Sequence, residues 1–187
     1  MKKIGESILE TYRLLFRLGS PSAPKTLNLR NNGQILEESG WKVAHVIDPY
    51  VGRFAGLAKG TFIIDDIAQC ASFAHRAPQS GCRCGFHAFH NRDDARKARA
   101  MRWGSVLLKV ELYGEIVRHE KGSRAAEQVV TGIYPYAICE KLLCKNISVG
   151  LSPIGTIWVS ACDLHLKDGV SLSDLHQLHS IEVLTSN

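Results

Sequence analysis

The strongest structural signal in the chain is SVLLKVELYGEIVRHEKGSRAAEQVVTGI, residues 105–133. In its first half, apolar side chains occupy every second position: Val106, Leu108, Val110 and Leu112. A period of two is typical of a β-strand with one buried face. Gly114 permits a bulge or bend, and Lys121-Gly122 marks a turn before the chain returns. The pattern predicts a long, bent, antiparallel hairpin over about 105–133 at the centre of a sheet.

Shorter elements are predicted on both sides of this hairpin. Strands are predicted at residues 41–47, 61–64 and 156–161, and Asn31-Asn32-Gly33 marks a second hairpin turn. Helices are predicted over 5–18, from the cap Asn91 through Met101, over one or two turns in 137–144, and from the cap Ser173 through Leu184. We therefore expect an α+β fold, in which three to four helices flank a mainly antiparallel bent sheet.

The length and composition favour a single domain over 1–187. A chain of 187 residues buries a substantial core. Hydrophobic residues make up 45% and charged residues 22%, as in soluble globular proteins rather than disordered ones. Residues 68–135 are the expected motif-bearing core. The N-terminal helix, within 1–19, either packs on the main body, which we favour, or is an appended arm.

No membrane or secretory segment is expected. The longest apolar run near the C-terminal third, residues 147–162, is interrupted by Gly150, Pro153 and Gly155 and is too short to span a bilayer. Near the N-terminus, charged side chains interrupt the apolar residues, so we expect no secretory signal and a cytoplasmic location. The formal net charge of +5 permits nucleic-acid binding without requiring it. No other partner and no oligomeric state is indicated.

Residue types that bind metals are concentrated in CASFAHRAPQSGCRCGFHAFH, residues 70–90. This stretch contains three of the six cysteines and three of the eight histidines. In a reducing compartment, cysteines at this density are reduced thiols or metal ligands rather than disulfides. Zinc takes four thiolate or imidazole ligands, and short spacings between ligands keep the entropic cost of closing the loop small. The stretch is therefore the best candidate site in the sequence.

Two ligand sets fit this stretch. The first is Cys70, His75, Cys82 and Cys84, in a loop whose Pro78 and Gly81 suit an irregular path. The second is Cys82, Cys84, His87 and His90. If residues 85–89 are extended, His87 and His90 point to opposite faces, so we favour the first set as a structural zinc site. Reduced, partly buried thiols, a redox-active Cys82/Cys84 pair and iron–sulfur ligation remain alternatives.

The other three cysteines give a weaker signal. Cys139 and Cys144 are five residues apart in a stretch expected to be helical, and Cys162 follows a predicted strand. A metal site built from them would depend on the fold. We expect them to be buried thiols that act as small apolar side chains.

Residues 68–135 resemble a family of small uncharacterised bacterial proteins with a C-x-C-G-(I/F)-(Y/H)-A motif. The resemblance rests on Cys70, on the H-x-A-P segment from His75, and on C-x-C-G-F-H-A from Cys82. It continues in V-x-L-x-G at 110–114 and G-x-R-A at 122–125, which match the family's strand pair. His87 stands where the family usually has tyrosine. The resemblance implies a shared fold and a common site, and it assigns no catalytic residue.

These observations favour a non-enzymatic binding or regulatory module with a structural zinc site in the Cys70–Cys84 loop. One alternative is a cysteine-dependent or redox enzyme using Cys82 or Cys84. In that enzyme His75 or His87 would act as the base, and Glu111 or Asp94 would orient the histidine. Another alternative is nucleic-acid binding through the basic helix 92–102, where Arg92, Arg96 and Arg99 would share one face.

Overall fold

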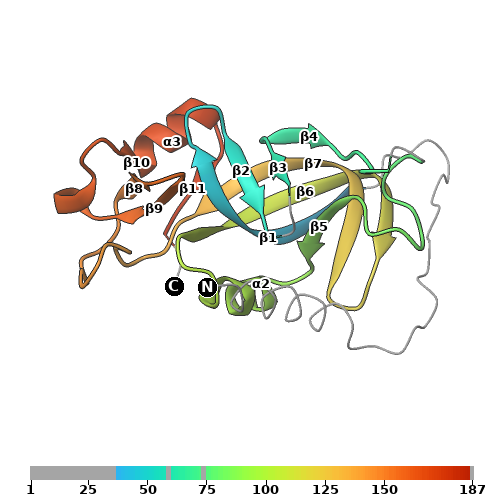
Figure 1. Ribbon diagram of the computed structural model, residues 1–187, viewed down its shortest axis with the longest axis horizontal. Helices are drawn as coiled ribbons and strands as arrows, with labels where there is room; N and C mark the ends of the chain where they lie inside the picture. Colours follow the sequence, from blue (N-terminus) through green and yellow to red (C-terminus); the bar gives the residue numbers. More distant parts are fainter. Residues whose placement is uncertain (1–36, 58–59, 73–74, 186–187) are drawn as a thin grey trace.

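The computed structural model describes residues 37–57, 60–72 and 75–185, which form one large, mainly antiparallel sheet (Figure 1). Its centre consists of three long strands: β1 (Glu37–Asp48), β6 (Ser105–Arg118) and β7 (Gly122–Tyr134). Strand β6 pairs with both β1 and β7, so the predicted hairpin lies at the centre of the sheet. The register of β6 against β7 shifts after Tyr113, and Gly114 there has φ 77°. The bend expected at Gly114 is therefore confirmed.

The alternation in β6 divides the core between the two faces of the sheet. The four alternating side chains are at most 1% exposed and belong to the main core: Val106, Leu108, Val110 and Leu112. Leu107, on the opposite face, packs with Ala95 and Ala98 of a helix and with Tyr134. A strand buried on both faces is what a central position in a covered sheet requires.

Shorter strands extend the sheet at both ends of the molecule. At one end lie β2 (Arg53–Gly56), β3 (Thr61–Phe62), β4 (Asp65–Ile67) and β5 (Phe86–Phe89). At the other end lie β8 (Gly150–Ile154), β9 (Ile157–Ala161), β10 (Val170–Ser171) and β11 (Glu182–Val183). Strand β11 pairs in parallel with β7, whereas the other pairs between named strands are antiparallel. The strands predicted at 41–47, 61–64 and 156–161 coincide with β1, β3 and β9.

The expected α+β fold with three to four flanking helices is wrong, because the described residues form mostly antiparallel sheet and contain two α-helices. Helix α2 (Arg92–Ala100) begins where predicted, because the Asn91 side chain accepts a hydrogen bond from the backbone N–H of Asp94 at 2.9 Å. Helix α3 (Leu172–His179) is capped by Ser171 rather than by the predicted Ser173. It ends five residues before Leu184, because Ser180 is left-handed at φ 52°. The helix and turn predicted within residues 5–33 lie outside the described residues.

Residues 137–144, which were expected to be helical, instead form an irregular loop. Ile138 makes an isolated antiparallel bridge with Ile147, and the N–H of Cys139 donates to the carbonyl of Asn146 at 2.9 Å. A short 3-10 helix, η1 (Asp163–His165), lies after β9. These two segments meet at a cysteine and histidine cluster, which explains why helix propensity does not determine the local structure.

Candidate metal centres

The four residues of the favoured set converge into one cluster, named here the loop cluster: Cys70, His75, Cys82 and Cys84. Their ligand atoms all lie within 4.8 Å of one another. Cys70 Sγ is 3.4 Å from His75 Nε2 and 3.8 Å from Cys82 Sγ. His75 Nδ1 lies 2.9 Å from the carbonyl oxygen of Arg76, which suits a donated hydrogen bond that leaves Nε2 free for a metal.

The sheet positions both ends of this loop. Before Cys70, strand β4 pairs with β7, and the Ala68 N–H donates to the Ala126 carbonyl at 2.7 Å. After Cys84, strand β5 also pairs with β7, with Phe86 opposite Ala125. Gly85 has φ 104°, and a Cβ there would lie 3.1 Å from the Ala125 oxygen, so this close approach requires glycine. The same short stretch of β7 therefore holds both ends of the loop.

Arg124 fixes the cysteine-bearing side of the loop. Its Nη1 donates hydrogen bonds to the carbonyl of Cys84, at 3.0 Å, and to the carbonyl of Cys82. A hydrogen bond from the Cys84 backbone lowers the pKa of the Cys82 thiol, whereas burial raises the pKa of the Cys84 thiol. A divalent ion with three thiolates and a neutral imidazole carries a net charge of −1, and the Arg124 guanidinium lies beside it with the opposite charge.

The rival ligand set is not assembled. His87 Nε2 lies 3.0 Å from the Arg83 carbonyl oxygen, and His90 Nε2 lies 3.0 Å from Ser123 Oγ and 3.4 Å from Glu38 Oε1. Neither histidine belongs to a cysteine and histidine cluster in the described residues. The first ligand set, which strand alternation favours, is therefore the one whose side chains lie together.

A second cluster, named here the β9 cluster, was not anticipated: Cys139, Cys144, Cys162 and His165. Its ligand atoms also lie within 4.8 Å of one another. His165 Nδ1 is 3.4 Å from the sulfurs of both Cys139 and Cys162, and the sulfurs of Cys144 and Cys162 are 3.7 Å apart. Cys139 and Cys162 are buried as expected, whereas Cys144 is only half-buried. All three lie beside one another and a histidine rather than among apolar neighbours alone.

Two tight turns build the β9 cluster. In the first, Leu143 is left-handed at φ 59° and the Cys144 N–H donates to the Lys141 carbonyl at 3.0 Å. In the second, η1 places His165 one turn after Cys162. Burial raises the pKa of the Cys162 thiol, but hydrogen bonds with Cys144 and His165 outweigh it and lower the pKa to about 6. The spacing Cys162-x2-His165 is the only local sequence signal for this cluster among the described residues, and it does not indicate Cys139 or Cys144.

The segments that carry the two clusters, the β4–β5 loop and the loops that flank β8 and β9, lie toward opposite ends of the molecule (Figure 1). Each could hold a metal ion, because each offers three thiols and one imidazole at ligand distances. Four protein ligands complete a tetrahedral site, with no position left for a substrate or a reactive water. The arrangement is therefore suited to stabilising the fold rather than to catalysis at the metal.

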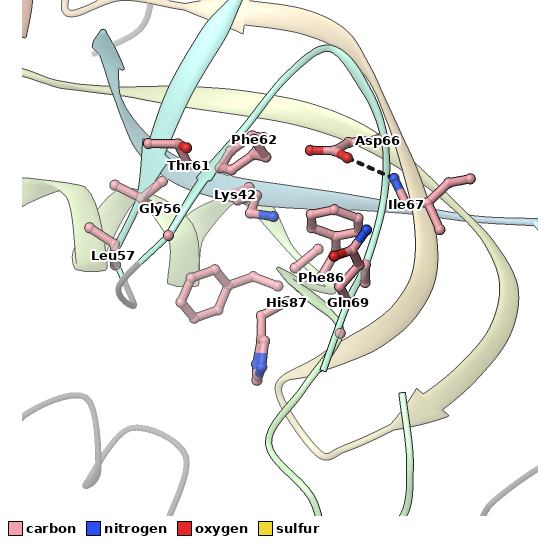
Figure 2. A pocket seen from close by; sticks show the side chains of 16 residues that line it. Lys42, Gly56, Leu57, Thr61, Phe62, Asp66, Ile67, Gln69, Phe86 and His87 are labelled. Carbon is pink, nitrogen blue, oxygen red and sulfur yellow. Dashed lines mark hydrogen bonds between the residues drawn. The ribbon is translucent and has the colours of Figure 1, made fainter. Parts of the chain in front are cut away.

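A cavity of about 470 Å³ adjoins the loop cluster (Figure 2). Residues on both sides of the loop line it, including Gln69 directly before Cys70 and Gly85 directly after Cys84. Lys42 of β1 reaches into the cavity between the rings of Phe62 and Phe86, at 4.2 and 4.8 Å from their centroids. Burial lowers the pKa of Lys42 to about 7, and that of His87 to about 4.

The basic helix proposed for nucleic-acid binding is partly turned inward. Arg92 stacks over the rings of Trp41 and Tyr134, at 5.1 and 5.2 Å from their centroids. Arg99 is 6% exposed and lies over Tyr136. Two of the three arginines expected on one basic face therefore pack against aromatic side chains, which weakens the case for a phosphate-binding surface.

Among the described residues, no helix has the length and apolar character needed to cross a membrane. Comparisons of the chain with models of protein families, with curated proteins and with solved structures find no match.

Proposed function

We propose that this protein is a non-enzymatic binding module whose sheet is stabilised at both ends by a structural zinc ion. One zinc is held by the loop cluster and the other by the β9 cluster. The observation that carries the proposal is that all six cysteines of the chain belong to these clusters, three in each, and that each cluster contains one histidine. Thiols buried simply as apolar side chains have no reason to divide in this way.

The chemistry of the ligands favours zinc. Thiolate and imidazole are the ligands of structural zinc sites, whereas magnesium and calcium prefer oxygen. Neither cluster includes a carboxylate. Free thiols kept for metal binding also suit a reducing, cytoplasmic setting. We further propose that the loop cluster is the site shared with the bacterial C-x-C-G family that residues 68–135 resemble.

A cysteine nucleophile is supported less well. A catalytic cysteine needs a base that a third group orients. His75 faces a backbone carbonyl rather than a carboxylate, and Asp94, one of the expected orienting groups, interacts with Asn91 and Lys97 on helix α2. Cys82 and Cys84 both face the other members of the loop cluster instead.

Elemental analysis of the purified protein tests the proposal. We expect two zinc ions per chain in the wild-type protein. The variants Cys82→Ser and Cys162→Ser should each contain one zinc ion, because each loses one of the four ligands of one cluster. The control His90→Gln should retain two, since His90 belongs only to the rival set. Strong chelators should unfold the protein. A protein that is fully folded without metal would refute the proposal.

A further inference from the structure

We propose that the cavity beside the loop cluster binds a small organic carboxylate, with Lys42 holding the carboxylate and Phe62 and Phe86 holding its apolar body. This inference deepens the binding role proposed above by naming the class of ligand. It rests on that role, although the cavity residues themselves are not metal ligands.

The dimensions and walls of the cavity suit a small molecule. Its volume of about 470 Å³ lies within the range typical of ligand pockets. Strands β1, β3, β4 and β5 all contribute to the lining, so most of the wall is sheet rather than a loose loop. Such pockets combine aromatic surface with a few convergent polar groups. Figure 2 shows this combination, with Lys42 between the aromatic rings and Gln69 and His87 nearby.

Lys42 has unused capacity to bind an anion. The residue is 9% exposed, and its ammonium donates one hydrogen bond, of 2.6 Å, to Gln128 Oε1. An ammonium has three donors. Among the described residues, no carboxylate lies within 4.0 Å of Lys42 Nζ. A buried cation without an ion-pair partner is costly, and an incoming carboxylate would remove that cost.

A second polar group beside Lys42 also has no partner. The Nε2 atom of Gln128 is buried without a hydrogen-bond acceptor, although the Oε1 atom of the same side chain accepts from Lys42. Gln128 is fully buried on β7, directly opposite Asp66 of β4. Gln128 does not line the cavity, so its role there is to hold the Lys42 ammonium through Oε1 rather than to contact a ligand.

The other charged group in the cavity is occupied elsewhere. The carboxylate of Asp66 accepts hydrogen bonds from the backbone N–H groups of Ile67, at 2.8 Å, and Ile63, at 3.3 Å. Its charge raises the pKa of Lys42 but does not offset the larger effect of burial. His87 on β5 is held neutral by burial, which lowers its pKa to about 4. A ligand carboxylate would therefore meet the Lys42 cation, with the Asp66 carboxylate elsewhere in the same lining.

The binding should depend on pH in one direction. A carboxylate contacts the protonated form of Lys42, so binding raises the pKa of this lysine and takes up a proton. Above pH 7 the free site increasingly loses that proton, because burial lowers its pKa to about 7. Affinity for a carboxylate should then fall by about tenfold per pH unit. The other ionisable groups that line the cavity are Asp66 and His87, and burial lowers the pKa of His87 to about 4.

The test uses the full-length, zinc-loaded protein with benzoate as the probe and benzyl alcohol as its uncharged counterpart, measured by calorimetry or ligand-observed NMR. We expect saturable binding of benzoate, weaker binding of benzyl alcohol, and a loss of at least about tenfold in benzoate affinity for Lys42→Met. Lys42→Arg keeps the charge and should retain part of the affinity. Lys109→Met, on β6 and outside the cavity, should bind as the wild type does.

Three results would overturn the inference. They are no binding of benzoate at about 10 mM, equal binding of benzoate and benzyl alcohol, and unchanged benzoate binding by Lys42→Met. The zinc content of the same sample separates this inference from the proposed function. Two zinc ions without benzoate binding would refute the carboxylate site alone, whereas a folded protein without zinc would refute the structural metal centres.

Discussion

The guanidinium of Arg124 donates a hydrogen bond of 3.0 Å to the backbone carbonyl of Cys84. Arg124 belongs to the central hairpin, and Cys84 is the last member of the loop cluster. This contact, together with the second one to Cys82, joins the segment that organises the sheet directly to the segment that gathers the metal ligands. The stability of the loop and the stability of the sheet should therefore be coupled.

Replacement of Arg124 by methionine tests this coupling. The change removes a charged donor from two carbonyls, and hydrogen bonds of this kind contribute about 1.5–3 kcal/mol each. We expect the free energy of unfolding of the zinc-loaded protein to fall by about 3–6 kcal/mol in urea titrations. The affinity for zinc, measured by competition with a chromophoric chelator, should fall as well. The control Arg53→Met changes an exposed arginine on β2 and should alter neither quantity.

The β9 cluster should stabilise its surroundings locally. The variant Cys144→Ser loses one ligand, so we expect one zinc per chain and faster amide hydrogen exchange in residues 139–148 and 162–166. Amides in the pairing of β6 with β7 should keep their protection, because that pairing lies in the central core. Equal loss of protection throughout the sheet would show instead that the cluster is needed for global folding.

Lys42 should make stability depend on pH. Burial lowers its pKa from 10.5 to about 7, so between these values the unfolded chain binds more protons than the folded protein does. The free energy of unfolding should therefore rise with pH across this window, by an amount on the order of 4 kcal/mol. Below pH 7 both states are protonated, and the folded protein bears the full cost of the buried charge.

The variant Lys42→Met isolates this effect. It should be more stable than the wild type at pH 6 and should lack the rise between pH 7 and 10.5, while other titrating groups contribute equally to both proteins. Urea unfolding at several pH values provides the measurement. Parallel pH profiles for the two proteins would show that the lysine is not buried as a cation.

The sequence predicted the central part of the fold because that part has local signals. The alternation from Val106 to Leu112 and the bend at Gly114 specify β6, and Asn91 caps helix α2 where expected. The pairing of β1 with four different strands depends on contacts between residues far apart in sequence, which no local pattern reveals. Similarly, no local pattern reveals the parallel pairing of β11 with β7, so the predicted helix extended into residues that form this strand.

The loop cluster could be predicted and the β9 cluster could not, for a related reason. Cys70 and Cys84 lie within one loop, so short spacings and strand alternation were enough to select the ligand set. The β9 cluster joins Cys139 and Cys144 to residues after the β8–β9 hairpin, and this hairpin has to form before the two halves meet. The helix propensity of residues 137–144 then gave the wrong local structure.

The most direct test of the two structural zinc sites is X-ray absorption at the zinc edge of the protein as purified, with the metal content measured on the same sample. We predict two zinc ions per chain with an average of three sulfur ligands at about 2.3 Å and one nitrogen ligand at about 2.0–2.1 Å. A first coordination shell made of oxygen and nitrogen, or a folded protein with no bound metal, would contradict the proposal of two structural zinc sites.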